Sequence, residues 1–178
     1  MDWPTKKYQI IYADPPWECS TQNIRGKKSY IKSTGSFHYN SMKLEDICSL
    51  PVNDIADKNA LLFLWGRSPC LNWAFKVGKA WGFNQFSTVG FVWDKQNPLP
   101  SYYTLSQVEL CLIFKKGKIP TPRGSRNQYQ FLSEKKRKHS QKPDIIRERI
   151  TKMFPSQSKM ELFARKTADG WDSWGDGI

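Results

Sequence analysis

The stretch that decides the fold is Tyr8-Gln9-Ile10-Ile11-Tyr12-Ala13, followed directly by Asp14-Pro15-Pro16-Trp17. The first six residues are mostly apolar and predict a buried strand. The acid, the two prolines and the tryptophan therefore lie where this strand ends. In open α/β sheets, ligands bind at the carboxyl ends of the strands. The sequence thus predicts a binding site formed by residues 14–17.

The chemistry of these four residues suits a flat base that carries an exocyclic amine. Such an amine attacks a methyl sulfonium only after its delocalised lone pair becomes more localised and the nitrogen more tetrahedral. Acceptors aimed at its hydrogens favour this change, and they act most in the transition state. The Asp14 carboxylate is one such acceptor. The carbonyls of Pro15 and Pro16 are others, because proline has no N–H and a nearly fixed φ.

We therefore predict that Asp14, Pro15, Pro16 and Trp17 are catalytic residues for methyl transfer to the N6 amine of adenine. Asp14 would act as acceptor and orienting group, because an ordinary carboxylate is too weak a base to deprotonate the neutral amine. Trp17 offers a flat face for stacking the base. The alternative interpretation is an ordinary Asp-Pro turn followed by a tryptophan that packs in the core.

Composition indicates a single domain over residues 1–178 with a partner rich in phosphate. The formal net charge is +12 and the sequence pI is about 9.6, which is typical of nucleic-acid-binding proteins. A generally soluble surface is the alternative. No apolar run is long enough to span a membrane, and the first residues do not resemble a secretory signal. We therefore expect a cytoplasmic protein without membrane association.

The cysteines are too far apart in the sequence for a zinc site, and only two histidines accompany them. We therefore expect neither a metal nor a disulfide. The cysteines are Cys19, Cys48, Cys70 and Cys111.

Strand-like and helix-like patterns alternate, which predicts an α/β fold with helices on both faces of a mostly parallel sheet. Residues 60–65 are almost wholly apolar, as in parallel strands that are buried on both faces. We expect strands at 8–13, 60–65, 86–93, 108–114, 129–132 and 159–164. We expect helices at 44–50, from 71 onward and from 143 to just before Pro155, and loops at 18–40 and 95–105.

The loop at 18–40 mixes basic and aromatic residues, Tyr39 among them, which suits a lid that grips a nucleic-acid strand. A solvated loop without a specific role is the alternative. Further tryptophans at expected strand ends or in loops are candidates for stacking. They are Trp65, Trp93, Trp171 and Trp174.

A nucleotide-like methyl donor needs a site, but no G-x-G-x-x-G loop is present. The best candidate is the last expected strand, Met160-Glu161-Leu162-Phe163-Ala164-Arg165. Glu161 and Arg165 flank an apolar stretch there, and a guanidinium suits ribose hydroxyls or a carboxylate. An ordinary surface ion pair is the alternative.

Several motifs together resemble the MT-A70 family of S-adenosylmethionine-dependent adenine-N6 methyltransferases. Each motif resembles one of the family's motifs, the motifs occur in the family's order, and together they cover nearly the whole chain. The motifs are Asp14-Pro15-Pro16-Trp17, Leu61-Leu62-Phe63-Leu64-Trp65, Ser140-Gln141-Lys142-Pro143-Asp144, Met160-Glu161-Leu162-Phe163-Ala164-Arg165 and Gly170-Trp171-Asp172-Ser173-Trp174-Gly175.

The resemblance implies a Rossmann-like fold with circularly permuted motifs, the catalytic motif early and the donor-binding motif late. It implies that Asp14 touches both the donor and the target amine, and that Lys142 lies beside both. Tyr39 would lie in a gate loop over the base, and Glu109 near the target adenine. Where family members usually continue the tail with Gly-Asn-Glu or Gly-Asn-Gln, this chain has Gly175-Asp176-Gly177.

The chemistry of the residues and the resemblance together give two sets of binding residues. Donor-binding residues would be Asp14, Lys142, Glu161, Phe163, Arg165 and Asp176. Substrate-binding residues would be Trp17, Tyr39, Trp65, Glu109 and Lys142.

The predicted function is methyl transfer from S-adenosylmethionine to adenine N6 in DNA, with the base flipped out of the duplex. The chain would act without a metal, as a monomer or homodimer, in a bacterial or phage-infected cell. RNA adenine is the second candidate substrate. A nucleic-acid-binding protein that has lost catalysis is the third possibility, motivated by the altered Asp176-Gly177.

Overall fold

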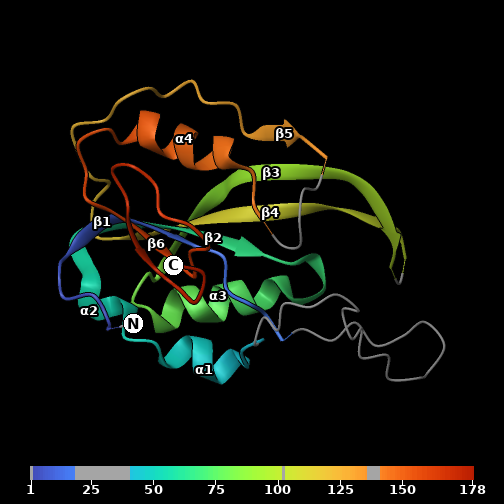
Figure 1. Cartoon of the computed structure of the whole chain (residues 1–178), viewed down its shortest axis with the longest axis horizontal. Helices are drawn as coiled ribbons and strands as arrows, with labels where there is room; N and C mark the ends of the chain where they lie inside the picture. Colours follow the sequence, from blue (N-terminus) through green and yellow to red (C-terminus); the bar gives the residue numbers. More distant parts are fainter. Residues whose placement is uncertain (1, 19–40, 102, 136–140) are drawn as a thin grey trace.

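The computed structural model describes residues 2–18, 41–101, 103–135 and 141–178. These residues form a seven-stranded sheet in the order β5-β3-β4-β2-β1-β6-β7 (Figure 1). The strands are β1 (Tyr8–Ala13), β2 (Ala56–Gly66), β3 (Gln85–Pro100), β4 (Leu105–Lys116), β5 (Phe131–Ser133), β6 (Lys159–Leu162) and β7 (Asp172–Trp174).

Strand β1 lies inside the sheet and pairs in parallel with β2 on one side and with β6 on the other. β7 pairs in parallel with β6, and β5 in parallel with β3. Only β4 is antiparallel to its neighbours β2 and β3. The predicted mostly parallel sheet is therefore confirmed, with an antiparallel hairpin inserted on one side of it.

Helices cover both faces of the sheet, as predicted (Figure 1). One face carries α1 (Leu44–Ser49), α2 (Val52–Ile55), the short 3₁₀ helix η1 (Ser68–Cys70) and α3 (Leu71–Ala80). The other face carries α4 (Asp144–Met153). None of the helices within the described residues is both long and apolar enough to cross a membrane.

The side chains of β1 explain why both faces are covered. Ile11 and Ala13 point into the core beneath α1–α3, whereas Ile10 and Tyr12 point into the core beneath α4. All four are buried, because successive residues of a strand face opposite sides and both sides are packed. The apolar run that predicted the strand therefore also accounts for the two layers of helix.

The expected loop at 95–105 is wrong, because most of it is strand. β3 continues to Pro100 and β4 begins at Leu105, so the two strands are separated by only four residues in the sequence. The prolines of this stretch suggested a loop, but proline is tolerated at strand edges and bulges. The pairing indeed breaks its register between Asp94 and Leu99.

The last expected strand, 159–164, ends two residues early, at Leu162. Phe163 has a φ of 60°, in the left-handed region, which breaks the strand. The Ala164 N–H then donates to the Trp174 carbonyl at 3.0 Å, so the tail packs beside β6. The expected lid falls largely on residues 19–40, including Tyr39, which lie outside the described residues.

Two glycines fit the tail against the end of β6. A Cβ atom on Gly175 would lie 2.5 Å from the backbone N and O of Ala164, and one on Gly177 would lie 2.5 Å from the Cα of Arg165. The tail can approach this closely only because both positions lack a side chain.

Replacing Gly175 by alanine should therefore lower the free energy of unfolding by about 1–3 kcal/mol, as overpacking does. Urea denaturation measures the change. Asp176→Ala, at an exposed position of the same tail, is the control and should change stability by less than about 0.5 kcal/mol. Equal stability of the two variants would contradict the close packing of the tail.

Candidate active site

Four charged side chains form a chain of alternating sign at the carboxyl end of β1. The Lys142 Nζ lies 2.6 Å from the Asp14 Oδ1 and 3.2 Å from the Glu109 Oε2. The Lys95 Nζ lies 3.2 Å from the other oxygen of Glu109, Oε1. These side chains are only 12–20% exposed, so little solvent screens them.

The topology explains why these four residues meet. Asp14 follows β1, and Lys142 lies just before α4. Because β4 is antiparallel to β2, the first residues of β4 lie at the carboxyl end of β2, where Gly66 pairs with Leu110. Glu109 therefore stands at the same edge as Asp14. Lys95 lies on β3, two residues after Trp93, which pairs with Glu109, and its side chain therefore reaches Glu109.

Burial and charge act in opposite directions on the three central groups. Burial raises the pKa of Asp14 above its ordinary value, although Lys142 opposes this. Burial would also raise the pKa of Glu109, but Lys142 and Lys95 together lower it. Burial would lower the pKa of Lys142, but Asp14 and Glu109 raise it. Lys142 and Glu109 are therefore charged at neutral pH.

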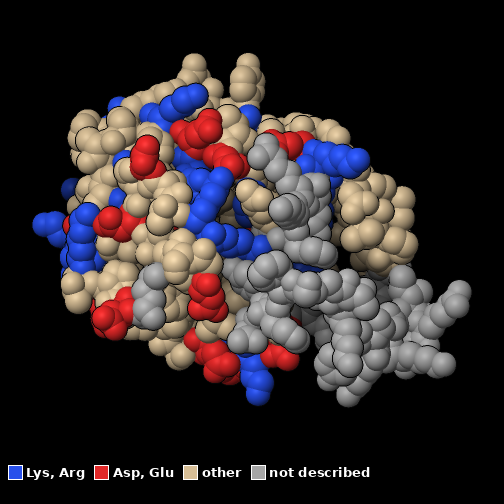
Figure 2. Space-filling view, viewed as in Figure 1, with Lys and Arg blue, Asp and Glu red and all other residues tan. Residues whose placement is uncertain are grey.

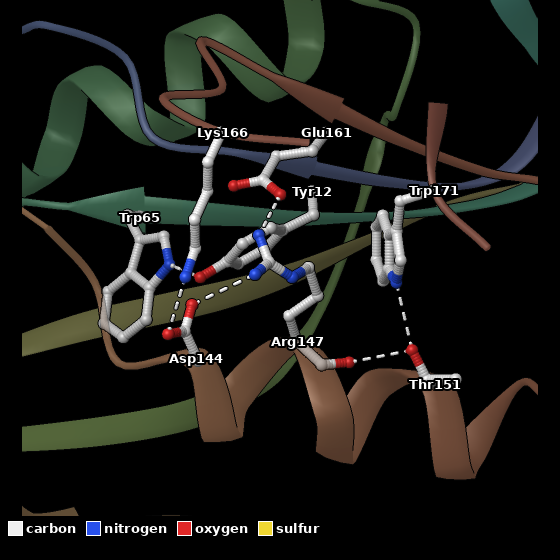
Figure 3. Close-up of polar contacts among 8 residues, drawn as sticks. All are labelled: Tyr12, Trp65, Asp144, Arg147, Thr151, Glu161, Lys166 and Trp171. Atoms are coloured by element: carbon white, nitrogen blue, oxygen red, sulfur yellow. Dashed lines mark hydrogen bonds and ion pairs between the residues drawn. The ribbon is translucent and has the colours of Figure 1, made fainter. Parts of the chain in front are cut away.

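The indole ring of Trp65 faces the ammonium group of Lys142. The Lys142 Nζ is 5.3 Å from the centre of the Trp65 ring, within the range of a cation–π contact. The Trp65 indole N–H donates to the Tyr12 hydroxyl at 2.8 Å, and both rings are buried (Figure 3). Burial keeps the pKa of Tyr12 well above its ordinary value, so the phenol is neutral.

The turn at 14–17 is held by its own hydrogen bonds. The Pro15 carbonyl accepts from the Trp17 N–H at 2.9 Å, and the Pro16 carbonyl accepts from the Met42 N–H at 2.8 Å. Each carbonyl has a second lone pair that can accept another donor. The Trp17 ring is buried in the core, and its indole N–H donates to the Trp65 carbonyl at 3.1 Å. Base stacking by Trp17 stays a prediction.

A second polar network joins α4 to β6. The Arg147 guanidinium lies 2.6 Å from the Glu161 Oε2 and 3.0 Å from the Asp144 Oδ1 (Figure 3). The Lys166 Nζ lies 2.8 Å from the second oxygen of Asp144. Burial raises the pKa of Glu161, and Arg147 opposes this. The network fixes the carboxylate that the sequence assigned to the donor site.

The remaining donor-site candidates lie just after the end of β6 and in the tail, and Phe163 is in the core beneath α1–α3. Phe163 is buried, and its ring lies 5.8 Å from that of Trp174. Arg165 is close enough to Asp14 for its positive charge to lower the pKa of that carboxyl. Asp176 is exposed between the two tightly packed glycines of the tail. The structure thus brings the early and late motifs of the chain to one edge of the sheet.

Some charged residues of the site were not predicted from the sequence. Lys95 was assigned to a loop, because its position depends on the irregular pairing of β3 with β4. Arg147 and Asp144 are three residues apart on α4, a spacing that could have indicated a pair on one helix face.

Within the described residues, no three His, Cys, Asp or Glu side chains are arranged to hold a metal ion.

Comparisons with known proteins agree with this geometry. The family model described as MT-A70 matches residues 8–177. The chain is 45% identical to the Type II methyltransferase M.MunI of a Mycoplasma species over 183 residues, which cover 97% of this chain and 78% of that protein.

Two animal relatives are more distant and much longer. The N(6)-adenine-specific methyltransferase METTL4 of Mus musculus is 26% identical, over 97% of this chain but only 38% of its own length. The N(6)-adenosine-methyltransferase subunit METTL3 of Danio rerio is 23% identical, over 89% of this chain and 26% of its own length. Because the family model spans nearly the whole sequence and one relative is 45% identical, this chain belongs to the MT-A70 family of methyltransferases.

Proposed function

We propose that this protein transfers a methyl group from S-adenosylmethionine to the N6 amine of adenine in DNA, and that residues 1–178 act as one methyltransferase domain. The observation that carries the proposal is the Asp14 carboxylate, fixed by Lys142 at the end of β1. Lys142 occupies one carboxylate oxygen, Oδ1, and Oδ2 is the oxygen that would accept a hydrogen bond from the amine.

Asp14 serves the reaction in two ways. Before transfer, its carboxylate accepts a hydrogen bond from the amine and favours a localised lone pair on the nitrogen. As the new N–C bond forms and the S–C bond breaks, the amine becomes positively charged and acidic. Asp14 can then take the departing proton, and its raised pKa makes it a better acceptor than an ordinary carboxylate.

Lys142 and Glu109 prepare the same site. Lys142 holds Asp14 in one orientation, which reduces the entropy cost of reaching the transition state. Glu109 is held ionised between Lys142 and Lys95 and is an acceptor for the edge of the base. The Trp65 ring forms a cation–π contact with Lys142 and keeps the site apolar on that side. A low-dielectric setting strengthens each of these contacts.

The donor would supply an electrophilic methyl group on a sulfonium. Its site would be formed by Glu161, Phe163, Arg165 and Asp176 at the end of β6 and in the tail. The residues present fit such a group, because a buried carboxylate held by Arg147 suits an alcohol or ammonium and the Arg165 guanidinium suits a carboxylate. Asp14 adjoins this site, as methyl transfer requires.

The electrostatics support a nucleic acid as the substrate. The net charge is +12, and Figure 2 shows Lys and Arg side chains gathered near the centre of one face of the molecule. The identity to a Type II methyltransferase supports DNA, whereas relatives named as adenosine methyltransferases keep RNA as the alternative.

The test is methyl transfer from labelled S-adenosylmethionine to duplex DNA, single-stranded DNA and RNA, followed by mass spectrometry of the nucleosides. Label in N6-methyldeoxyadenosine supports the proposal, and label in N6-methyladenosine alone replaces DNA by RNA. No label together with no stabilisation of the fold by the donor would favour a non-catalytic nucleic-acid-binding protein.

Asp14→Asn should lower kcat by about 10²–10⁴-fold, because the amide is a weaker acceptor and cannot take the proton. The labelled-methyl assay measures this loss, with thermal unfolding to verify the fold. Asp46→Asn, at an exposed position in α1, is the matched control and should leave kcat unchanged. Turnover of Asp14→Asn at the level of this control would exclude the role assigned to Asp14.

Lys142→Met should move the acid limb of the pH profile of kcat/KM to higher pH. Activity requires ionised Asp14, so it falls as the pH drops through the pKa of that group. Lys142 lowers this pKa, and its removal therefore raises it further. Lys152→Met, an exposed lysine of α4, serves as the control. An acid limb at the same pH in both variants would contradict the electrostatic role of Lys142.

A further inference from the structure

The described residues between 96 and 107, which are 96–101 and 103–107, include the end of β3 and the start of β4 and form a two-stranded arm. Figure 1 shows the two strands extending well beyond the helices and the rest of the sheet. β2 ends at Gly66, which pairs with Leu110, so the residues of β4 before Leu110 project past the end of β2. At the usual rise per residue, Leu105 lies roughly 15 Å beyond that point. The arm therefore projects from the edge that carries Asp14.

The composition of the arm differs from that of the rest of the chain. Charged residues make up 25% of the protein, yet the sequence from 96 to 107 contains none. It consists of amide and hydroxyl side chains, prolines, leucines and tyrosines. Such groups match base edges, which are read by hydrogen bonds and apolar contacts, whereas phosphates are bound mainly by Lys and Arg. Lys95, just before the arm, is paired with Glu109, so the arm presents uncharged groups.

Apolar side chains lie on both faces of the arm. Leu99 pairs with Ser106, and Pro100 pairs with Leu105. Directly paired residues share a face and successive residues alternate, so Leu99 and Leu105 point to opposite sides. They are 51% and 64% exposed, and Tyr103 at the tip is 99% exposed. A ribbon with two apolar faces suits insertion into a groove better than docking by one flat face.

A cluster of hydrogen bonds fixes the direction of the arm. The Asp94 carboxylate accepts from the Gln107 side chain at 2.6 Å, from the Gln96 N–H at 2.9 Å and from the Ser133 hydroxyl at 2.8 Å. These bonds hold the pKa of Asp94 below its ordinary value. They brace the bulge from which the arm departs, and such bracing lowers the entropy cost of binding.

We propose that this arm enters a groove of the target duplex beside the flipped adenine and reads the edges of neighbouring base pairs. The inference rests on the proposed function and assigns the recognition of sequence to residues 96–107. The major groove of B-DNA is wide enough for a two-stranded ribbon. The exposed amide of Asn97 suits the edge of adenine, and Leu99 and Tyr103 suit the methyl group of thymine.

The experiment first maps the methylated sequence of plasmid DNA treated with the wild-type protein. Duplexes with this sequence, and duplexes with one base pair replaced, are then methylated by Asn97→Ala and by the double variant Leu99→Ala/Tyr103→Ala. Tyr129→Ala is the control, because Tyr129 is 80% exposed and lies outside the arm. Sedimentation velocity and thermal unfolding are measured on every variant.

Each arm variant should lower kcat/KM on the mapped sequence by about 10- to 100-fold, with a much smaller loss on the replaced duplexes. Discrimination at particular base pairs should therefore shrink. The dependence of binding on salt should stay unchanged, because no charge is removed. The control should behave as the wild type.

Unchanged discrimination in both arm variants would overturn the inference and leave the proposed function intact. An equal loss on all duplexes, with a fall in the sedimentation coefficient, would assign the arm to contact between two copies of the chain. Failure of the wild-type protein to methylate any DNA would instead remove the proposed function itself.

Discussion

The position of β1 between β2 and β6 is the constraint on which the rest of the site depends. Ala13 pairs with Leu64 on one side and with Leu162 on the other, so β1 and β6 end at the same level of the sheet, and β2 continues two residues further, to Gly66. Asp14, Trp65 and Phe163 follow directly after these three paired residues. A shift of one residue in either pairing would turn these side chains to the opposite face. The buried alternation of β1 therefore sets the register of the active site.

The charges at the site compensate one another rather than reflect the basic character of the chain. Asp14 and Glu109 face Lys142 and Lys95, so two negative and two positive groups lie together. Unpaired burial of any one of them would be costly. The surplus of positive charge therefore lies elsewhere on the molecule, where phosphates could be bound, while the neutral cluster can meet an uncharged base.

Local patterns in the sequence predicted the boundaries of strands, turns and helices that depend only on neighbouring residues. The apolar run of β1, the turn at 14–17 and the proline at the start of α4 each correspond to an observed boundary. The position of Lys95 could not be predicted in this way, because it depends on a break in register between two strands. The burial of Trp17 was equally hidden, since a strand-end tryptophan can face solvent or the core. Contacts that join distant segments require the tertiary structure.

The order of the strands also has a consequence for how the protein is made. Ile10 pairs with Lys159, so β1 leaves the ribosome well before one of its two neighbours, which follows after 148 intervening residues. Translation at about 5–20 residues per second leaves this apolar strand half covered for roughly 7–30 s. Asp14 and Lys142 likewise meet only late in synthesis. The nascent chain thus lacks the Asp14–Lys142 pair while β1 is half covered, and chaperone demand should concentrate in that interval.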